Sequence, residues 1–184
     1  WSSDVCSSDL SREIVEIALS RMLAGTGGMA EFAPALATFT GGSGAVAVLL
    51  TDGSFAVPRG RRLLGAVSET APEFFELCQW GMKPQPTGQF EQFMLTDSVA
   101  VLKNGTALGA KTWAAFQKAL DWDNAMVDKI ICHQVGSQHQ ESFLKLTGLP
   151  REKDYTTFRY LGNMGTAALP VTAAIAEERG VLKR

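Results

Sequence analysis

The chain has 184 residues, of which 46% are hydrophobic and 20% charged, and its formal net charge at pH 7 is −2. These values are ordinary for a soluble globular protein and allow one domain with its own core, or parts of two. The 17 basic and 19 acidic residues are mixed along the chain, so no basic block indicates nucleic-acid binding. No apolar run reaches the roughly 18–20 residues that a membrane span needs.

The first ten residues, WSSDVCSSDL, differ from the rest of the chain. They are polar and Ser-rich, without the basic and apolar regions of a signal peptide. Their codons can be read in frame from a common sequencing-library adapter, so we expect residues 1–10 to be an adapter artefact and leave them out of the fold. A native Ser-rich tail is the alternative. We further expect an internal fragment, because the final ERGVLKR has no natural ending.

Two cysteines remain when Cys6 is excluded with the adapter, namely Cys78 and Cys132. They are too few for a disulfide framework and suit a reducing, cytoplasmic location. His133 and His139 are six residues apart, a spacing that does not place both on one helix face, and no carboxylate cluster joins them. We therefore expect neither a metal ion nor a bound cofactor.

The first half of the chain predicts a helix over 11–23, ended by Gly25, and a strand over 45–50. The strand is a continuous apolar run, which is typical of burial on both faces. Gly42 and Gly44 loosely fit a dinucleotide-binding fingerprint. That motif must follow a strand and open a helix, whereas these glycines precede a strand. They predict instead a tight turn that lets two backbones approach closely.

The middle of the chain predicts a strand over 61–69 and the longest helix over 97–120. Between them, residues 71–92 are aromatic-rich and broken by prolines, which predicts a short helix followed by an irregular loop. Within the long helix, Gly105 and Gly109 are four residues apart. Because each costs helix stability, they indicate close packing against a neighbouring element.

The last third predicts a strand over 126–133 and a helix over 137–147 that ends at Gly148. Successive strand side chains point to opposite faces. If His133 points into a pocket, Cys132 therefore points into the core and is no nucleophile.

A pair of polar residues carries the candidate chemistry, and they are 30 residues apart, far enough for the chain to run out along a helix and return. His133 ends an apolar run, and Asn163 lies in a Gly-rich turn ahead of a helix predicted near 166–178. Alone, a histidine at a strand end is more often structural, and an asparagine between glycines is more often a turn residue. Together, in the order HQ…GNMGTAALP, they predict a pair that faces across a catalytic pocket.

These motifs resemble a known family. ICHQVG and YLGNMGTAALP are similar to the His and Asn motifs of the β-ketoacyl-ACP synthase III family of the thiolase superfamily. TFTGGSGAVAVLL resembles that family's Gly-rich turn and following strand. SREIVE, ELCQWG and TDSVAVLKNGTALGAKTW are most similar to the OleA-type subgroup, which condenses two acyl-CoA chains head to head. The resemblance covers nearly all of residues 11–184.

The resemblance implies an α/β fold, the layered αβαβα thiolase-like architecture, of which the chain holds a part. Residues 11–60 would end the N-terminal half, and residues 61–184 would form a truncated C-terminal half. It also implies a homodimeric acyltransferase with a Cys–His–Asn triad that acts on acyl-CoA or acyl carrier protein thioesters. His133 and Asn163 would donate hydrogen bonds to the developing enolate or oxyanion, and His133 could transfer a proton. The implied nucleophilic cysteine lies upstream, so the fragment alone is expected to be inactive.

Four functions stay open from the residues. The first is an OleA-type condensation of two acyl-CoA molecules in lipid or long-chain hydrocarbon biosynthesis. The second is a synthase III that extends acyl-CoA with malonyl-ACP in fatty-acid or polyketide biosynthesis. The third, of another class, is a non-catalytic thiolase-fold subunit that pairs with an active partner. The fourth is a soluble α/β domain of unassigned function.

Overall fold

The computed structural model describes residues 2–8, 12–25, 28–54 and 60–183. Its elements in chain order are β1 (Ser2–Ser8), α1 (Arg12–Ala24), α2 (Met29–Phe39), β2 (Gly44–Leu50), the 3₁₀ turn η1 (Pro72–Leu77), β3 (Cys78–Pro84), β4 (Phe90–Thr96), α3 (Ser98–Leu120), α4 (Ser137–Thr147), the 3₁₀ turn η2 (Arg151–Lys153), α5 (Phe158–Leu161), the 3₁₀ turn η3 (Gly165–Ala167) and α6 (Ala168–Glu178). Among the described residues the strands form two antiparallel pairs, β1–β2 and β3–β4.

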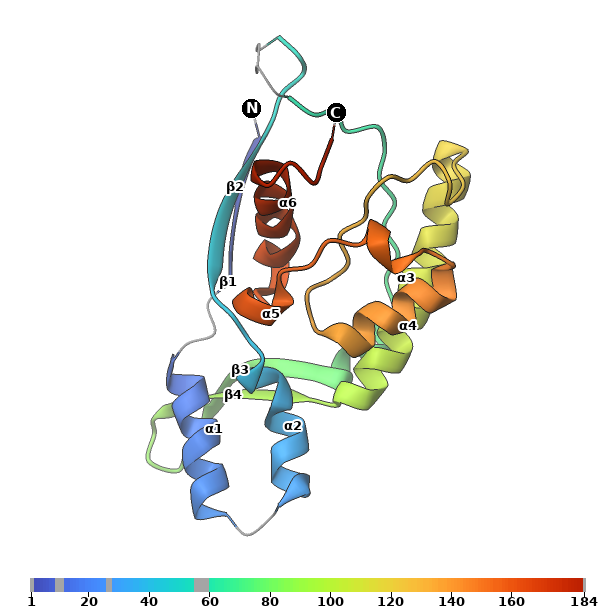
Figure 1. Ribbon diagram of the computed structural model, residues 1–184. Coiled ribbons are helices and arrows are strands. Elements are labelled where there is room, and N and C mark those ends of the chain that lie inside the picture. The colour runs from blue at the N-terminus through green and yellow to red at the C-terminus, as the bar shows by residue number, and fades with distance from the viewer. Residues whose placement is uncertain (1, 9–11, 26–27, 55–59, 184) are drawn as a thin grey trace.

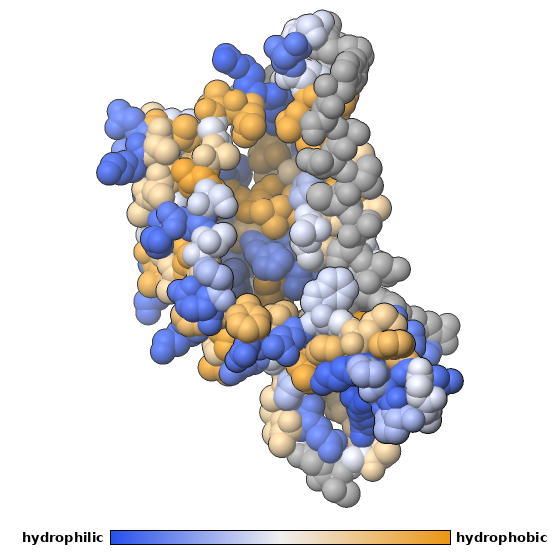
Figure 2. Space-filling view, turned by 180° about the vertical axis from the view of Figure 1, so that it is seen from behind, coloured by the Kyte–Doolittle hydropathy of each residue, from blue (hydrophilic) through white to orange (hydrophobic). Residues whose placement is uncertain are grey.

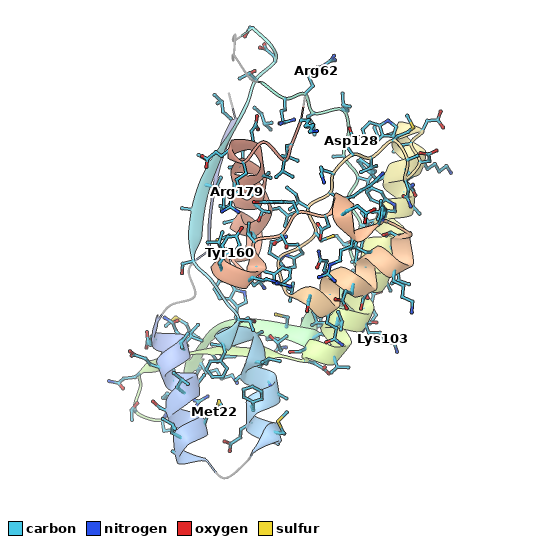
Figure 3. The ribbon with its side chains drawn as sticks, viewed as in Figure 1. Met22, Arg62, Lys103, Asp128, Tyr160 and Arg179 are labelled. Atoms are coloured by element: carbon cyan, nitrogen blue, oxygen red, sulfur yellow. The ribbon has the colours of Figure 1, made fainter. Side chains whose placement is uncertain are left out.

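The elements form two side layers joined at one end by the β3–β4 hairpin (Figure 1). The β1–β2 pair and α6 make one layer, and α3 with α4 makes the other, while α1 and α2 pack against the hairpin. Seen from behind, the molecule is hollowed between these layers, and both hydrophobic and hydrophilic residues lie on the walls of the hollow (Figure 2). In Figure 3, Met22 lies between α1 and α2, where it lines a smaller cavity of about 570 Å³.

The β1–β2 ladder runs in register from Ser2 opposite Leu50 to Ser8 opposite Gly44. Sequence reasoning left residues 2–8 out of the fold, yet the structure places them in this ladder. Strand pairing joins backbone groups, so a polar segment can pair with the edge of β2 without apolar side chains of its own. The strand predicted over 45–50 is confirmed as β2.

The predicted burial of β2 on both faces is wrong for the described structure. Val48 is 40% exposed, and Leu49 and Leu50 are each 51% exposed. Helix α6 packs against one face of β2 (Figure 1). The apolar side chains at the end of the strand are therefore not covered on both faces.

The three longest predicted helices of the second half are confirmed as α3, α4 and α6. Asp97 caps α3, because its side chain accepts a hydrogen bond from the backbone N–H of Ala100 at 2.9 Å. Gly148 ends α4 in the left-handed conformation at φ 68°. Caps and apolar periodicity are local signals, which is why these helices can be predicted from sequence.

Close packing of α3 is confirmed at one of its two glycines. A Cβ added at Gly109 would lie 3.1 Å from the ring of Phe143 on α4. A Cβ at Gly105 would meet nothing within 4 Å, because this glycine faces the large cavity described below.

Several predicted elements are wrong. Residues 61–69 lie in coil, and the strand predicted over 126–133 is also coil, with a single bridge between Ile130 and Asp154. The irregular loop predicted within 71–92 is instead the ordered hairpin of β3 and β4, and α2 was not predicted at all. An apolar run becomes a strand only where a second strand pairs with it, and local sequence does not identify that partner.

The buried core consists of small clusters on either side of the hollow. Cys132, Leu144 and Leu149 form one beneath α4, and Met164, Ala167 and Ala168 form another beneath α6. Within the part of the chain that the structure describes, no helix is long and apolar enough to cross a membrane.

Candidate active site

A cavity of about 950 Å³, larger than the one lined by Met22, brings together the residues that the sequence singled out. His133 and Asn163 both line it, although they come from different loops on opposite sides of α4 in the sequence. The rest of the wall comes mainly from one face of α3, including Leu102, Gly105 and Phe116, and is largely apolar. A mostly apolar cavity with a few polar groups is typical of a site for a small ligand.

The loop that carries His133 is held by buried polar contacts. The backbone N–H of Cys132 donates to Oδ1 of Asp154 at 3.1 Å. Gln134 is fully buried, and its Nε2 donates to the backbone carbonyl of Cys132 at 2.6 Å. Its Oε1 accepts from the backbone N–H groups of Thr157 at 2.7 Å and Phe158 at 3.1 Å. His133 is therefore flanked by two residues whose positions are fixed.

The turn that carries Asn163 crosses the Gly-rich turn before β2. Asn163 donates its backbone N–H to the carbonyl of Thr40, and its carbonyl accepts from the N–H of Gly42, both at 2.9 Å. A Cβ at Gly42 would lie 1.9 Å from the carbonyl oxygen of Leu161, which only glycine avoids. The close approach of two backbones predicted at Gly42 is thus confirmed, and the second backbone is that of the turn that carries Asn163.

The side-chain amide of Asn163 has one defined orientation. Its Oδ1 accepts a hydrogen bond from the backbone N–H of Gly165 at 3.0 Å. Because the backbone N–H of Gly165 can only donate, the side-chain atom of Asn163 that faces it must be the amide oxygen. The NH₂ group of Asn163 is then the end of the amide that remains to donate. An amide NH₂ in a cavity can stabilise a negative oxygen.

The surroundings of His133 favour its neutral form. Burial of the ring lowers its pKa, and the neighbouring His139 lowers it further. The two rings are 6.2 Å apart between centroids and nearly perpendicular. Although His133 keeps open surface toward the cavity, the protein atoms around it displace the water that would solvate an imidazolium ion.

His139 also lines the cavity and was not predicted as a site residue. Burial lowers the pKa of its ring, and its Nδ1 is buried without a hydrogen-bond partner. Its position on the first turns of α4, six residues after His133, was visible in the sequence. The sequence did not show that the loop between them folds the two rings together.

The two described cysteines differ in environment. Cys132 is 6% exposed, and burial, together with the nearby Asp154, raises the pKa of its thiol to about 12. This confirms the prediction that Cys132 is a core residue, and the raised pKa disfavours the thiolate that a nucleophile needs. Cys78 is exposed and lines the cavity, with its Sγ 3.6 Å from Oγ1 of Thr96. Sequence reasoning gave Cys78 no catalytic role and did not place it at this cavity.

Part of the chain matches a known protein family. Residues 117–184 match the family described as 3-oxoacyl-[acyl-carrier-protein] synthase III C terminal. The predicted resemblance to the synthase III family is confirmed, and the architecture is the thiolase-like αβ fold, present in part.

The chain is similar to two acyl-CoA:acyl-CoA alkyltransferases. It is 45% identical to the enzyme of Shewanella oneidensis over 97% of the chain and 52% of that protein. It is 32% identical to the enzyme of Xanthomonas campestris over 93% of the chain and 48% of that protein. The chain therefore spans about half the length of the relatives it matches.

Solved structures of Xanthomonas campestris OleA agree with this similarity. A cysteine-to-serine variant with bound lauric acid and lauroyl-CoA has a TM-score of 0.84 at 30% identity, covering 99% of this chain and 51% of the other. The cerulenin-bound form has a TM-score of 0.84 at 31% identity, covering 99% and 50%. The likeness thus extends along nearly the whole chain.

Proposed function

We propose that the protein to which this chain belongs is an acyltransferase that condenses two acyl-CoA molecules head to head into a β-ketoacyl product. The observation that carries the proposal is the presence of His133 and Asn163 on the wall of one largely apolar cavity. The similarity to acyl-CoA:acyl-CoA alkyltransferases supports it along 97% of the chain. An apolar cavity suits two long acyl chains, because their burial is favourable at about 25 cal/mol per Å².

The reaction consists of two steps. In the first, a cysteine thiolate attacks the thioester carbonyl of one acyl-CoA, the carbonyl–sulfur bond to CoA breaks, and CoA leaves as a thiolate that takes up a proton from solvent. In the second, a base removes a proton from the α-carbon of another acyl-CoA. The resulting carbanion attacks the acyl-enzyme carbonyl, so that a C–C bond forms and the cysteine thiolate leaves. The reaction requires no oxidant, reductant or cofactor.

His133 and Asn163 are the catalytic residues of this proposal. The Asn163 NH₂ is available as a donor, and a neutral His133 offers either an N–H donor or a basic nitrogen. Two neutral donors stabilise an enolate or oxyanion as it forms without trapping it as a permanent ion pair. The nucleophile is proposed to lie upstream of residue 11, and residues 1–10 to be the adapter artefact. The fragment alone is then inactive.

A synthase III reaction with malonyl-ACP is the second candidate, and the family match of residues 117–184 favours it. We also propose a cytoplasmic homodimer. Exposed apolar side chains on β2 and on the hairpin, such as Leu50 and Trp80, support burial against further protein. The domain proposal stays as predicted, with residues 11–60 ending one thiolase-like half and 61–184 forming most of the other.

The first test begins with the DNA. Amplification of the source DNA across the junction at residue 11 gives the native upstream codons and the full gene. A cysteine in a small-residue turn at the start of a helix supports a condensing enzyme. A serine, alanine or glycine there contradicts it and favours the non-catalytic partner subunit.

The second test identifies the acylated residue and the substrate. The intact protein is incubated with long-chain acyl-CoA, and the acylated peptide is mapped by mass spectrometry. We expect the label on the upstream cysteine and a β-keto product from acyl-CoA alone. Cys78→Ser is the matched control, because this thiol shares the cavity and should not be needed. Loss of condensation in Cys78→Ser, or a product only with malonyl-ACP, would overturn the proposal.

The roles of the pair are tested by His133→Ala and Asn163→Ala. Each should lower condensation by about 10²–10³-fold, the usual cost of a lost transition-state donor. Acylation of the nucleophile should be less affected, because enolate stabilisation belongs to the second step. Retained condensation in both variants would remove the roles assigned to them.

A further inference from the structure

The side chain of Gln134 joins the two loops that carry the proposed catalytic residues. It is fully buried next to His133 and makes the three hydrogen bonds described above, one to the backbone of Cys132 and two to the backbone at Thr157 and Phe158. A buried primary amide with several short contacts has little freedom to move. Its two ends therefore fix the distance between the backbone before His133 and the backbone that opens α5.

Gln134 provides the N-terminal cap that α5 lacks. The first N–H groups of a helix have no partner within the helix. Thr157 holds the cap position of α5 but makes no side-chain capping bond, because its hydroxyl pairs with Thr172 on α6 at 2.7 Å. Gln134 accepts those N–H groups from the His133 loop instead. The start of α5 is thus set by the residue that follows the histidine.

Helix α5 transmits this position to Asn163. It has a single turn, Phe158–Leu161, and the N–H of Gly162 donates to the carbonyl of Phe158 at 3.1 Å. Asn163 follows directly. Two other contacts between these segments both reach Asp154, which is farther from Asn163 along the chain than Thr157 and Phe158. They are the bridge from Ile130 and the hydrogen bond from the backbone N–H of Cys132. Gln134 is therefore the tie nearest to both proposed catalytic residues.

We propose that Gln134 is a positioning residue that sets the separation of His133 and Asn163 in the cavity. The inference rests on the proposed function, since those two residues must act on one anion. A displacement of about 1 Å costs about 10²-fold in rate when two groups act on one reacting centre. If the hydrogen bonds of Gln134 served stability alone, their loss would lower the rates of acylation and condensation equally.

The test compares Gln134 with Asn124, because the side-chain amide of each makes three hydrogen bonds. Gln134→Met keeps the length of the side chain and removes its hydrogen bonds. The control is Asn124→Leu. Asn124 accepts from Nε1 of Trp113 and Nε2 of Gln117 and donates to the carbonyl of Thr147, at 3.1, 3.0 and 2.8 Å. It does not line the cavity. Both variants are made in the intact protein, and their melting temperatures are compared.

Acylation and condensation are measured separately. Acyl-enzyme formation is followed by intact mass, and condensation is started by adding acyl-CoA to preformed acyl-enzyme. We expect Gln134→Met to lose about 10²-fold in condensation and to keep acylation near the wild-type rate. Asn124→Leu should keep both rates at a similar loss of stability. Equal losses in both variants, or wild-type condensation in Gln134→Met, would overturn the proposal.

Gln134→Glu supplies a rescue experiment. Its carboxyl oxygen can still accept from Thr157 and Phe158, but only the protonated acid can donate to the carbonyl of Cys132. Burial favours that protonated form, so condensation relative to wild type should rise as the pH falls. A flat ratio contradicts the proposal. The titratable residues of the surrounding segments are present in both proteins, and the wild-type pH profile is the reference for their titration: Cys132, His133, His139 and Asp154.

A crystal structure of Gln134→Met separates this inference from the proposed function. If the wild type does not condense acyl-CoA, the proposed function fails. Gln134 still holds its positioning role if His133 and Asn163 have moved relative to each other in this variant and not in Asn124→Leu. An unchanged separation in Gln134→Met overturns the positioning role, whatever the activity.

Discussion

Replacing Gly42 by alanine tests how the two turns of the site are joined. The backbone of Gly42 does not have a positive φ, so alanine meets no conformational strain there. The obstacle is contact, because the new Cβ would lie 1.9 Å from the carbonyl oxygen of Leu161 and 3.0 Å from its carbon. Ordinary contact begins near 3.4 Å, so the turn of Asn163 must move away from Gly42.

That movement has a cost that the structure allows to be estimated. The two backbone hydrogen bonds between these turns are worth about 1 kcal/mol each, and overpacking adds about 1–3 kcal/mol. The lower entropy of alanine in the unfolded chain offsets less than about 1 kcal/mol. We expect Gly42→Ala to lower the free energy of unfolding by about 2–5 kcal/mol and to displace Asn163, with loss of condensation.

Urea denaturation of the intact protein measures the change, with Gly105→Ala as the matched control. A Cβ at Gly105 meets nothing within 4 Å, so this variant should gain about 0.5–1 kcal/mol from the better helix propensity of alanine. A substitution at an exposed site usually changes the free energy of unfolding by less than about 0.5 kcal/mol. If Gly42→Ala changes it by no more than that, the inferred contact between the two turns is wrong.

Three further predictions concern the environment of the site. Because the pKa values of His133 and His139 are lowered from 6.5, the unfolded chain binds more protons just below that pH. The free energy of unfolding, measured by urea denaturation, should therefore fall as the pH drops from about 7 to 5. His139→Phe should make this dependence on pH weaker, and an unchanged dependence would contradict the prediction. Cys132, with a thiol pKa of about 12, should resist iodoacetamide at about pH 8 while Cys78 reacts; equal labelling by peptide mass would refute this. Thr157→Val and Thr172→Val should each cost about 1 kcal/mol, and the double variant should cost less than their sum, because both remove the same 2.7 Å hydrogen bond; additive losses would show that the hydroxyls do not interact.

The helices were the predictable part of the fold. The start of α3 is marked by Asp97, and the end of α4 is marked by Gly148, so each boundary is encoded within a few residues. The strands were less predictable. Residues 61–69 and 126–133 have strand-like composition, but no strand of the described chain pairs with them. Pairing depends on the neighbour, so the same pattern formed a strand only at β2.

The candidate site was predictable in identity but not in geometry. The His and Asn motifs identified His133 and Asn163 because their flanking residues are distinctive together. The alternation of side chains also gave the burial of Cys132 correctly, although the segment is coil rather than a strand. The place of Cys78 on the same cavity was not predicted, because the hairpin that brings it there was read as an irregular loop.

The sequence by itself determined helices α1, α3, α4 and α6, the family resemblance and the two residues proposed for the chemistry. Each of these depends on patterns within short segments. Only the tertiary structure decided how these residues meet. Gly42 contacts the turn of Asn163 across about 120 residues of chain, and Gln134 reaches Thr157 across 23. Such contacts follow from packing between distant segments, and local periodicity contains no information about them.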